Sequence, residues 1–149
     1  MSISKVSERM NDLKPVDSNL IDVLTENLSS TIFSNLEGKY QTEPRGRYYS
    51  SSKFVAKPRS KDEVSEILKM ANSIGFGIIP YSGGSGLVCG QISTDGQPLV
   101  LSLERMNKFL EFDAPSGIVK VESGMVLSEL KKITSSFGRQ FPLTLASEG

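Results

Sequence analysis

The segment that most restricts the fold is residues 53–79, which reads as a strand, a helix and a second strand. After the short apolar strand at 53–57, Ser60 and Glu63 form a capping box, in which the hydroxyl and the carboxylate each satisfy a free backbone N–H. One face of the helix carries apolar residues at helical spacing, namely Val64, Ile67, Leu68, Ala71 and Ile74. A glycine then ends the helix. The segment predicts a βαβ unit with parallel strands and a right-handed crossover.

The rest of the chain predicts further elements of both kinds. Ser18 is the expected cap of a helix with Leu20, Val23, Leu24 and Leu28 on its apolar face. Residues 98–103 predict a strand, residues 108–122 a β-hairpin that turns at 114–117, and residues 127–138 a helix. Together these patterns indicate an α+β arrangement that contains a small parallel unit.

The two ends of the chain are less regular in pattern. Residues 1–14 look like a loosely held helix or tail, with Val6, Met10 and Leu13 at helical spacing. Residues 34–52 form a long polar connection, of the kind that is often functional or packs on another part of a protein. We expect an N-terminal helical segment over 1–35 and the main domain over 36–149. The chain stops just after an apolar segment, which suggests that it is cut short.

Composition removes several classes of chemistry. The chain has no histidine, which excludes Ser-His and Cys-His nucleophile pairs and most zinc sites. Its single cysteine, Cys89, excludes an internal disulfide. Seventeen basic residues balance seventeen acidic ones without any basic cluster, so a nucleic-acid partner is not expected. Apolar runs are far shorter than the ~20 residues of a membrane span. No signal-peptide core is present near the N-terminus, so we expect a cytoplasmic protein without a transmembrane segment.

The strongest local signal is the run at 80–90, PYSGGSGLVCG, which places four glycines in eight positions after a strand. Glycines let the backbone approach a ligand closely, and successive N–H groups can form a nest for phosphate oxygens. The Walker A pattern is excluded because no lysine occurs between Lys69 and Lys108. The fingerprint GxGxxG fails because Cys89 stands where its third glycine would be, and no clear amphipathic helix follows. A tight turn without a ligand remains an alternative.

Two other segments are weaker candidates, each of which could also be an ordinary turn. Gly124, between the hairpin and the last helix, could let backbone contact a flat ligand edge. Pro142 is followed by small residues against which a ring could pack. Cys89 is better interpreted as a packed thiol than as a reactive one. Arg45 and Arg47 could clamp an anionic group, although solvated loop arginines are commoner.

In this order the segments resemble the FAD-binding domain of the vanillyl-alcohol oxidase/PCMH-type flavoproteins. Within that family they are most similar to the FAD-linked D-2-hydroxyacid dehydrogenases, which act on D-2-hydroxyglutarate, D-lactate or glycolate. The resemblance covers 36–149, and its matching segments are 55–58 with 60–64, 79–90, 101–107, 116–130 and 141–149. It implies an α+β fold with a small parallel βαβ subdomain and the start of a mixed or antiparallel second subdomain.

The resemblance also implies site residues. Those expected to hold the FAD pyrophosphate and close its loop are Pro80, Ser82, Gly83, Gly84, Ser85, Gly86, Leu87 and Gly90. Those expected near the flavin or its ribityl chain are Gly124, Met125, Pro142, Leu143, Thr144 and Ala146. Cys89 departs from the family pattern, since glycine is usual at that position. The lack of histidine argues against a histidyl-linked flavin, so noncovalent FAD is implied.

The implied reaction is oxidation of a D-2-hydroxy acid to a 2-oxo acid, with the flavin doing the redox chemistry. The substrate site, the catalytic residues and the contact with an electron acceptor are expected in a C-terminal half, so this chain is expected to carry no catalytic residue and no metal. Alone it should retain FAD weakly or not at all and should not turn over substrate. Rival interpretations are another PCMH-type flavoenzyme (an aryl-alcohol oxidase or a cell-wall-precursor reductase), an FAD-binding non-catalytic subunit of a multi-chain oxidoreductase, and a truncated product without function.

Overall fold

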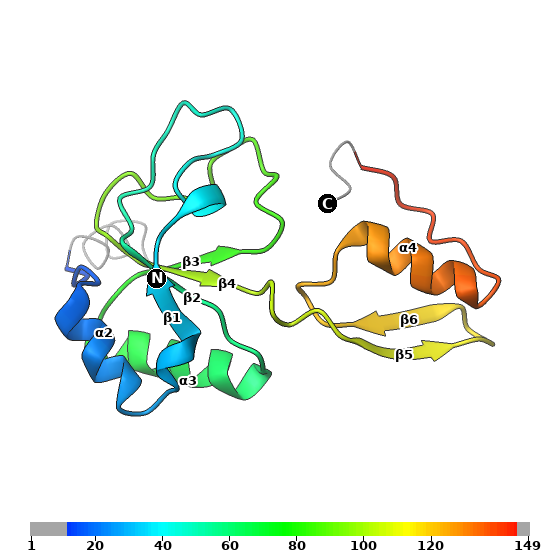
Figure 1. The fold of residues 1–149 in the computed structure, drawn as a ribbon, viewed down its shortest axis with the longest axis horizontal. Coiled ribbons are helices and arrows are strands. Elements are labelled where there is room, and N and C mark those ends of the chain that lie inside the picture. The colour runs from blue at the N-terminus through cyan, green and yellow to red at the C-terminus, as the bar shows by residue number, and fades with distance from the viewer. Residues whose placement is uncertain (1–11, 146–149) are drawn as a thin grey trace, which may run out of the picture.

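The computed structural model describes residues 12–145, which form two lobes joined by the connection after β4 (Figure 1). The first lobe contains α2 (Ser18–Thr25), η1 (Ser30–Ile32), β1 (Phe33–Asn35), η2 (Gly38–Tyr40), β2 (Phe54–Ala56), α3 (Lys61–Ile74), β3 (Ile78–Tyr81) and β4 (Leu99–Ser102). The second lobe contains β5 (Phe109–Asp113), β6 (Ile118–Val121) and α4 (Leu127–Ser136). Val6 and Met10, predicted to belong to an N-terminal helix, lie outside the described residues.

The first lobe is built on a four-stranded sheet in the order β1-β2-β4-β3. β2 and β3 both run parallel to β4, which confirms the parallel strands predicted for the βαβ unit. β4 comes after β2 and β3 in the sequence but lies between them in the sheet. The crossover from β2 through α3 to β3 therefore skips one strand position. β1, which the sequence did not predict, pairs antiparallel with β2.

Alternation along the strands gives the sheet two apolar faces. Ala56, Leu99 and Leu101 pack with residues of α2 and α3, including Leu24 and Ile67. The opposite face carries a second cluster, made by Leu36, Tyr40, Val55, Tyr81 and Val100. The helices therefore cover one face, and the segment that contains η2 covers the other.

Capping explains where α3 begins and ends. The Ser60 hydroxyl accepts the Glu63 N–H at 3.2 Å, as predicted, while the Glu63 carboxylate accepts the N–H of Arg59 at 2.6 Å, one residue before the cap. Gly75 takes φ 87° and donates its N–H to Ala71 O at 2.9 Å. The predicted apolar face is wrong at Leu68, which is 48% exposed, because the helix turns Met70 toward the core instead.

The predicted cap of α2 is wrong by one residue. Asp17, not Ser18, is the N-cap, and its carboxylate accepts the Leu20 N–H at 2.9 Å. The predicted apolar face is also wrong at Val23, which is 44% exposed, whereas Ile21 packs against the core. The cap is set locally by the extended backbone of Asp17, whereas docking of this short helix on the sheet decides which apolar side chains are buried.

The second lobe confirms the predicted hairpin and helix. β5 and β6 pair antiparallel, and Gly117 closes their turn by donating its N–H to Asp113 O at 2.8 Å. α4 packs on the hairpin through Phe137, whose ring stacks 4.8 Å from that of Phe112. Within 109–145, only Leu130 and Thr134 are buried. Across residues 12–145, no helix combines the length and the apolar character needed to cross a membrane.

Candidate functional site

The glycine-rich loop begins where β3 ends, at the carboxyl edge of the parallel strands (Figure 1). Lys57, at the end of β2, and Ser102, at the end of β4, lie at this same edge because the three strands run in one direction. The carboxyl edge is where open α/β sheets bind ligands. The ladder ends at the base of the loop, where Leu103 donates its N–H to Tyr81 O at 3.0 Å.

The backbone of the loop leaves its donors free. Among residues 12–145, no acceptor is found for the N–H of any residue from Ser82 to Val88, and residues 87–88 form a turn before Cys89. Two loop carbonyls, by contrast, are bound: the side-chain amide of Gln91 donates to Gly84 O at 3.1 Å and to Gly86 O at 2.7 Å. A loop with satisfied carbonyls and unpaired amides has the polarity that an anion requires.

Gly84 fits a tight space between the loop and Tyr81. It has φ 66°, and a Cβ at this position would overlap the Tyr81 hydroxyl and ring. Tyr81 cannot easily move aside, since its hydroxyl donates to Lys39 O at 3.1 Å and its ring meets that of Tyr40 edge-on at 4.7 Å. Glycine is needed here so that the loop can fold down onto the tyrosine.

A charged cluster lies beside this tyrosine pair. The Glu104 carboxylate binds Lys39 Nζ at 2.6 Å and Lys57 Nζ at 3.0 Å. Burial raises the pKa of Glu104, but the hydrogen bonds from the two lysines outweigh that effect and hold the pKa at about 2. The hydrogen bond to Glu104 in turn raises the pKa of Lys39. With two cations and one carboxylate, the cluster has a net positive charge.

The turn at 122–125 is joined to the glycine loop by a hydrogen bond from the Ser82 hydroxyl to Ser123 O at 3.3 Å. Its glycine has a packing role. A Cβ on Gly124 would overlap Leu103 O and lie 2.9 Å from Met106 O, which also accepts the Gly124 N–H at 2.8 Å. The structure thus brings the first two candidate segments together and explains Gly124 by contact between two backbones. Met125, half-buried beside it, donates its N–H within the turn.

The third candidate segment lies on the second lobe, where the chain reverses after α4 (Figure 1). Pro142 lines a cavity of about 270 Å³ there together with Phe112, Val119 and Phe141. Leu143 is 46% exposed and Thr144 is exposed, while Ala146 lies outside the described residues. Their assignment to the flavin stays a prediction, as do the assignments of the exposed Pro80, Leu87 and Gly90.

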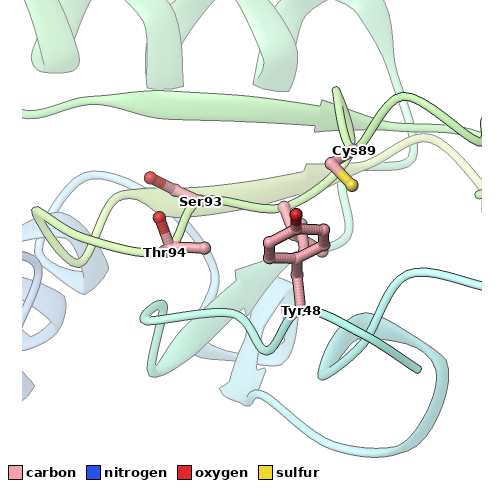
Figure 2. Close-up of a pocket in the computed structure, with 5 residues that line it drawn as sticks. Tyr48, Cys89, Ser93 and Thr94 are labelled. Atoms are coloured by element: carbon pink, nitrogen blue, oxygen red, sulfur yellow. The ribbon is translucent and has the colours of Figure 1, made fainter. Parts of the chain in front are cut away.

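Cys89 shows why its position favours glycine. It takes φ 63°, a left-handed conformation that a side chain disfavours. Its side chain faces Tyr48, as Figure 2 shows, across a pocket of about 310 Å³ that Ile92, Ser93 and Thr94 complete. The pocket lies on the flank of the glycine loop, and Cys89 is the only loop residue that lines it.

The arginine turn is organised by a carboxylate beneath it. Buried Glu43 accepts the N–H of Arg45 at 2.7 Å and the N–H of Arg47 at 2.6 Å. Burial raises the pKa of Glu43, but these backbone donors lower it further than burial raises it. Both arginines are exposed, so their role as an anion clamp stays a prediction.

Comparison with known proteins identifies the family. A family model described as "FAD binding domain" matches residues 52–149. The chain belongs to this FAD-binding family. A putative mitochondrial D-lactate dehydrogenase of Schizosaccharomyces pombe is 32% identical over 133 residues, which is 89% of this chain and 24% of the relative. A probable mitochondrial D-2-hydroxyglutarate dehydrogenase of Oryza sativa subsp. indica is 36% identical over 104 residues, which is 70% of this chain and 18% of the relative. The chain thus spans a quarter or less of the length of these relatives.

Solved structures confirm the predicted α+β fold. An alkyldihydroxyacetonephosphate synthase superposes with a TM-score of 0.71 at 19% identity, over 87% of this chain and 27% of the other. A berberine bridge enzyme variant gives 0.61 at 21% identity, over 78% of this chain and 26% of the other. At these identities the likeness shows the fold alone.

The residues present fit the FAD diphosphate. The loop offers unpaired N–H groups at the carboxyl edge of the sheet, and Gly84 lets it pack closely on Tyr81. Sequence reasoning missed the two supporting side chains, Tyr81 and Gln91, as well as the carboxylate of Glu104. The one local signal for Tyr81 was that an aromatic residue stands two positions before the first glycine of the loop. Gln91 carries no signal in the sequence, because its role depends on the loop folding back.

Proposed function

We propose that this chain supplies the FAD-gripping part of a flavin-dependent dehydrogenase that oxidises a D-2-hydroxy acid to a 2-oxo acid. Support for the substrate class comes from the relatives, whose names describe D-lactate and D-2-hydroxyglutarate dehydrogenases. Glycolate remains a further candidate from the family resemblance. The chemistry that FAD supplies when bound is the two-electron oxidation of the alcohol.

The observation that carries the cofactor part of the proposal is the set of unpaired loop amides after β3. Backbone donors fixed by the fold bind a diphosphate without having to be reordered first. The net positive charge of the Glu104 cluster favours the same anion, since Lys39 Nζ lies 5.9 Å from the ring of Tyr81, against which Gly84 packs. The chain's own task is therefore to hold the cofactor by its diphosphate.

A titration of the purified chain with FAD, ADP and FMN tests this task. FAD and ADP both carry a diphosphate, whereas FMN carries a single phosphate. We expect FAD and ADP to shift the amide resonances of 82–90 in 15N-labelled protein, and FMN to shift them much less. Equal shifts with all three, or shifts confined to other segments, would contradict a diphosphate site in this loop.

The substrate is tested on the complete gene product, loaded with FAD and supplied with a dye as electron acceptor. D-lactate or D-2-hydroxyglutarate should reduce the dye, and the L enantiomers should not. A product that holds FAD but oxidises neither acid would favour the rival hypothesis of a non-catalytic FAD-binding subunit. We propose that the flavin is reoxidised by another electron carrier and not by oxygen.

The compartment is a separate proposal. The sequence predicts a cytoplasmic protein, while the two relatives above are described as mitochondrial. Fluorescence microscopy of the complete gene product, tagged at its C-terminus, distinguishes the two locations.

A further inference from the structure

We propose that Gln91 is a positioning residue for the cofactor loop, and that its side-chain amide aims the N–H groups of Ser85 and Leu87 at the FAD diphosphate. This inference rests on the proposed function, since it names the residue that gives that site its shape. Gln91 itself is expected to make no contact with the cofactor.

Gln91 is placed to bind two carbonyls at once. Gln91 is only 8% exposed, and its amide nitrogen lies 3.1 Å from Gly84 O and 2.7 Å from Gly86 O. A primary amide carries two N–H donors on one nitrogen, so each carbonyl receives its own hydrogen bond. The assignment of nitrogen and oxygen follows from the partners, because two carbonyl oxygens require a donor.

Fixing a carbonyl also fixes the following N–H. In a planar trans peptide, the N–H of the next residue points opposite to the carbonyl. All peptide bonds in the described part of the chain are trans. With Gly84 O and Gly86 O turned toward Gln91, the N–H groups of Ser85 and Leu87 must both point away from it.

These two N–H groups are available to an anion. Neither has an acceptor among residues 12–145, and both residues are exposed. They are two residues apart and both lie on the side of the loop away from Gln91, where one anion could accept from both. Gln91 therefore gives a flexible glycine segment a defined polarity before any cofactor arrives.

Two substitutions separate this role from simple charge effects. Gln91→Leu removes both donors at nearly constant size, and Gln91→Glu removes them and adds a negative charge. We expect both variants to bind FAD and ADP at least about tenfold more weakly, because two carbonyls lose their partners and the peptides can rotate. Gln41→Glu, at an exposed position in the first lobe, makes the same charge change and should leave the affinity within about twofold of that of the original chain.

The affinities are measured by NMR titration with FAD and with ADP, and thermal unfolding of each variant is measured beside them. Weak binding by both Gln91 variants, with unfolding still cooperative, supports the proposal. If Gln91→Leu binds as tightly as the original chain while Gln91→Glu does not, repulsion explains the loss and the positioning role is overturned. If neither the original chain nor the complete gene product binds either ligand, the proposed function fails together with this role.

The cofactor-free chain gives a second readout that remains useful if a variant does not fold. Hydrogen-bonded side-chain amide protons exchange slowly with solvent, so those of Gln91 should be protected relative to those of exposed Gln41. Equal, fast exchange at both glutamines would overturn the proposal whatever the affinities are. Protection at Gln91 without FAD binding by the complete gene product would place the failure in the proposed function.

Discussion

The loop at 82–90 and the turn at 122–125, which a hydrogen bond from the Ser82 hydroxyl joins, need their glycines for different reasons. In the loop at 82–90 the backbone keeps the N–H groups of 82–88 unpaired, and Gly84 allows the chain to pack on a tyrosine ring. In the turn at 122–125 the N–H of Gly124 is used within the protein, and two backbones meet where its side chain would be. Packing between the two lobes thus requires a glycine at position 124, and its predicted place near the flavin stays a prediction.

The largest expected effect is on the contact between the turn at 122–125 and Leu103, where the two lobes are joined. Gly124→Ala forces a methyl group against Leu103 O, a backbone atom that cannot move without disturbing the end of β4. We expect a loss of about 3 kcal/mol in the free energy of unfolding. Urea denaturation measures it, with Gly90→Ala as the control because nothing lies within 4 Å of a Cβ there. Equal midpoints for the two variants would show that this contact can yield.

Gly84→Ala should act on the loop itself. The new methyl group meets the buried Tyr81 ring at φ 66°, so we expect about 2 kcal/mol of destabilisation together with weaker FAD binding. Gly83→Ala is the matched control, since its nearest neighbour would be Ser85 Oγ at 4.0 Å. Circular dichroism gives the stability and NMR titration the affinity. If the two variants bind FAD equally, packing on Tyr81 does not shape the loop.

Low pH should weaken the Glu104 ion pairs beside the glycine loop and leave the contact between Gly124 and Leu103 unchanged. The pKa of Glu104 falls from 4.5 to about 2 on folding, so its contribution to stability is complete above pH 4.5 and is lost as pH falls toward 2. Because Lys39 is 55% exposed, we expect about 1 kcal/mol after solvent screening. Urea midpoints at pH 6 and pH 3 measure it. Glu104→Gln should show a smaller pH dependence than the original chain, and an identical one would contradict this assignment.

The smallest expected effect is an increase in the free energy of unfolding. Cys89→Gly removes a side chain from a left-handed position, and we expect a gain of about 0.5 kcal/mol because relief of strain slightly exceeds the extra freedom of glycine in the unfolded chain. Differential scanning calorimetry should detect a slightly higher midpoint. A lower midpoint would mean that packing of the thiol against Tyr48 outweighs the strain.

The sequence predicted the elements whose signals are local. The capping serine of α3, its apolar spacing and the turn glycines at 75 and 117 depend on residues within a few positions of one another, and the structure has them where predicted. β1 was missed because three residues, one of them Phe33, become a strand only by pairing with β2. Leu68 was misplaced because packing on the sheet sets the rotation of the helix.

The candidate site also has one part with a local sequence signal and another part that depends on tertiary structure. Glycines after a strand predicted a candidate phosphate loop from local sequence alone, and their contact with FAD stays a prediction. Tyr81 and Gln91 became visible only once the loop had folded back, because their partners are Lys39 O on one side and two loop carbonyls on the other. Sequence thus predicts the backbone segment of the candidate site, and tertiary structure shows the side chains that shape it.

The central position of β4 has a consequence for the order of folding during synthesis. A nascent chain that has left the ribosome only as far as β3 holds two strands whose shared neighbour does not yet exist. Long-range pairing of this kind is slow, because the intervening chain must close first. The loop also lacks its anchor at that stage, since Leu103 follows β4 and binds Tyr81 O. The glycine loop and the middle of the sheet can therefore be completed only after β4 has emerged, so a ribosome pause shortly before that point would leave both exposed.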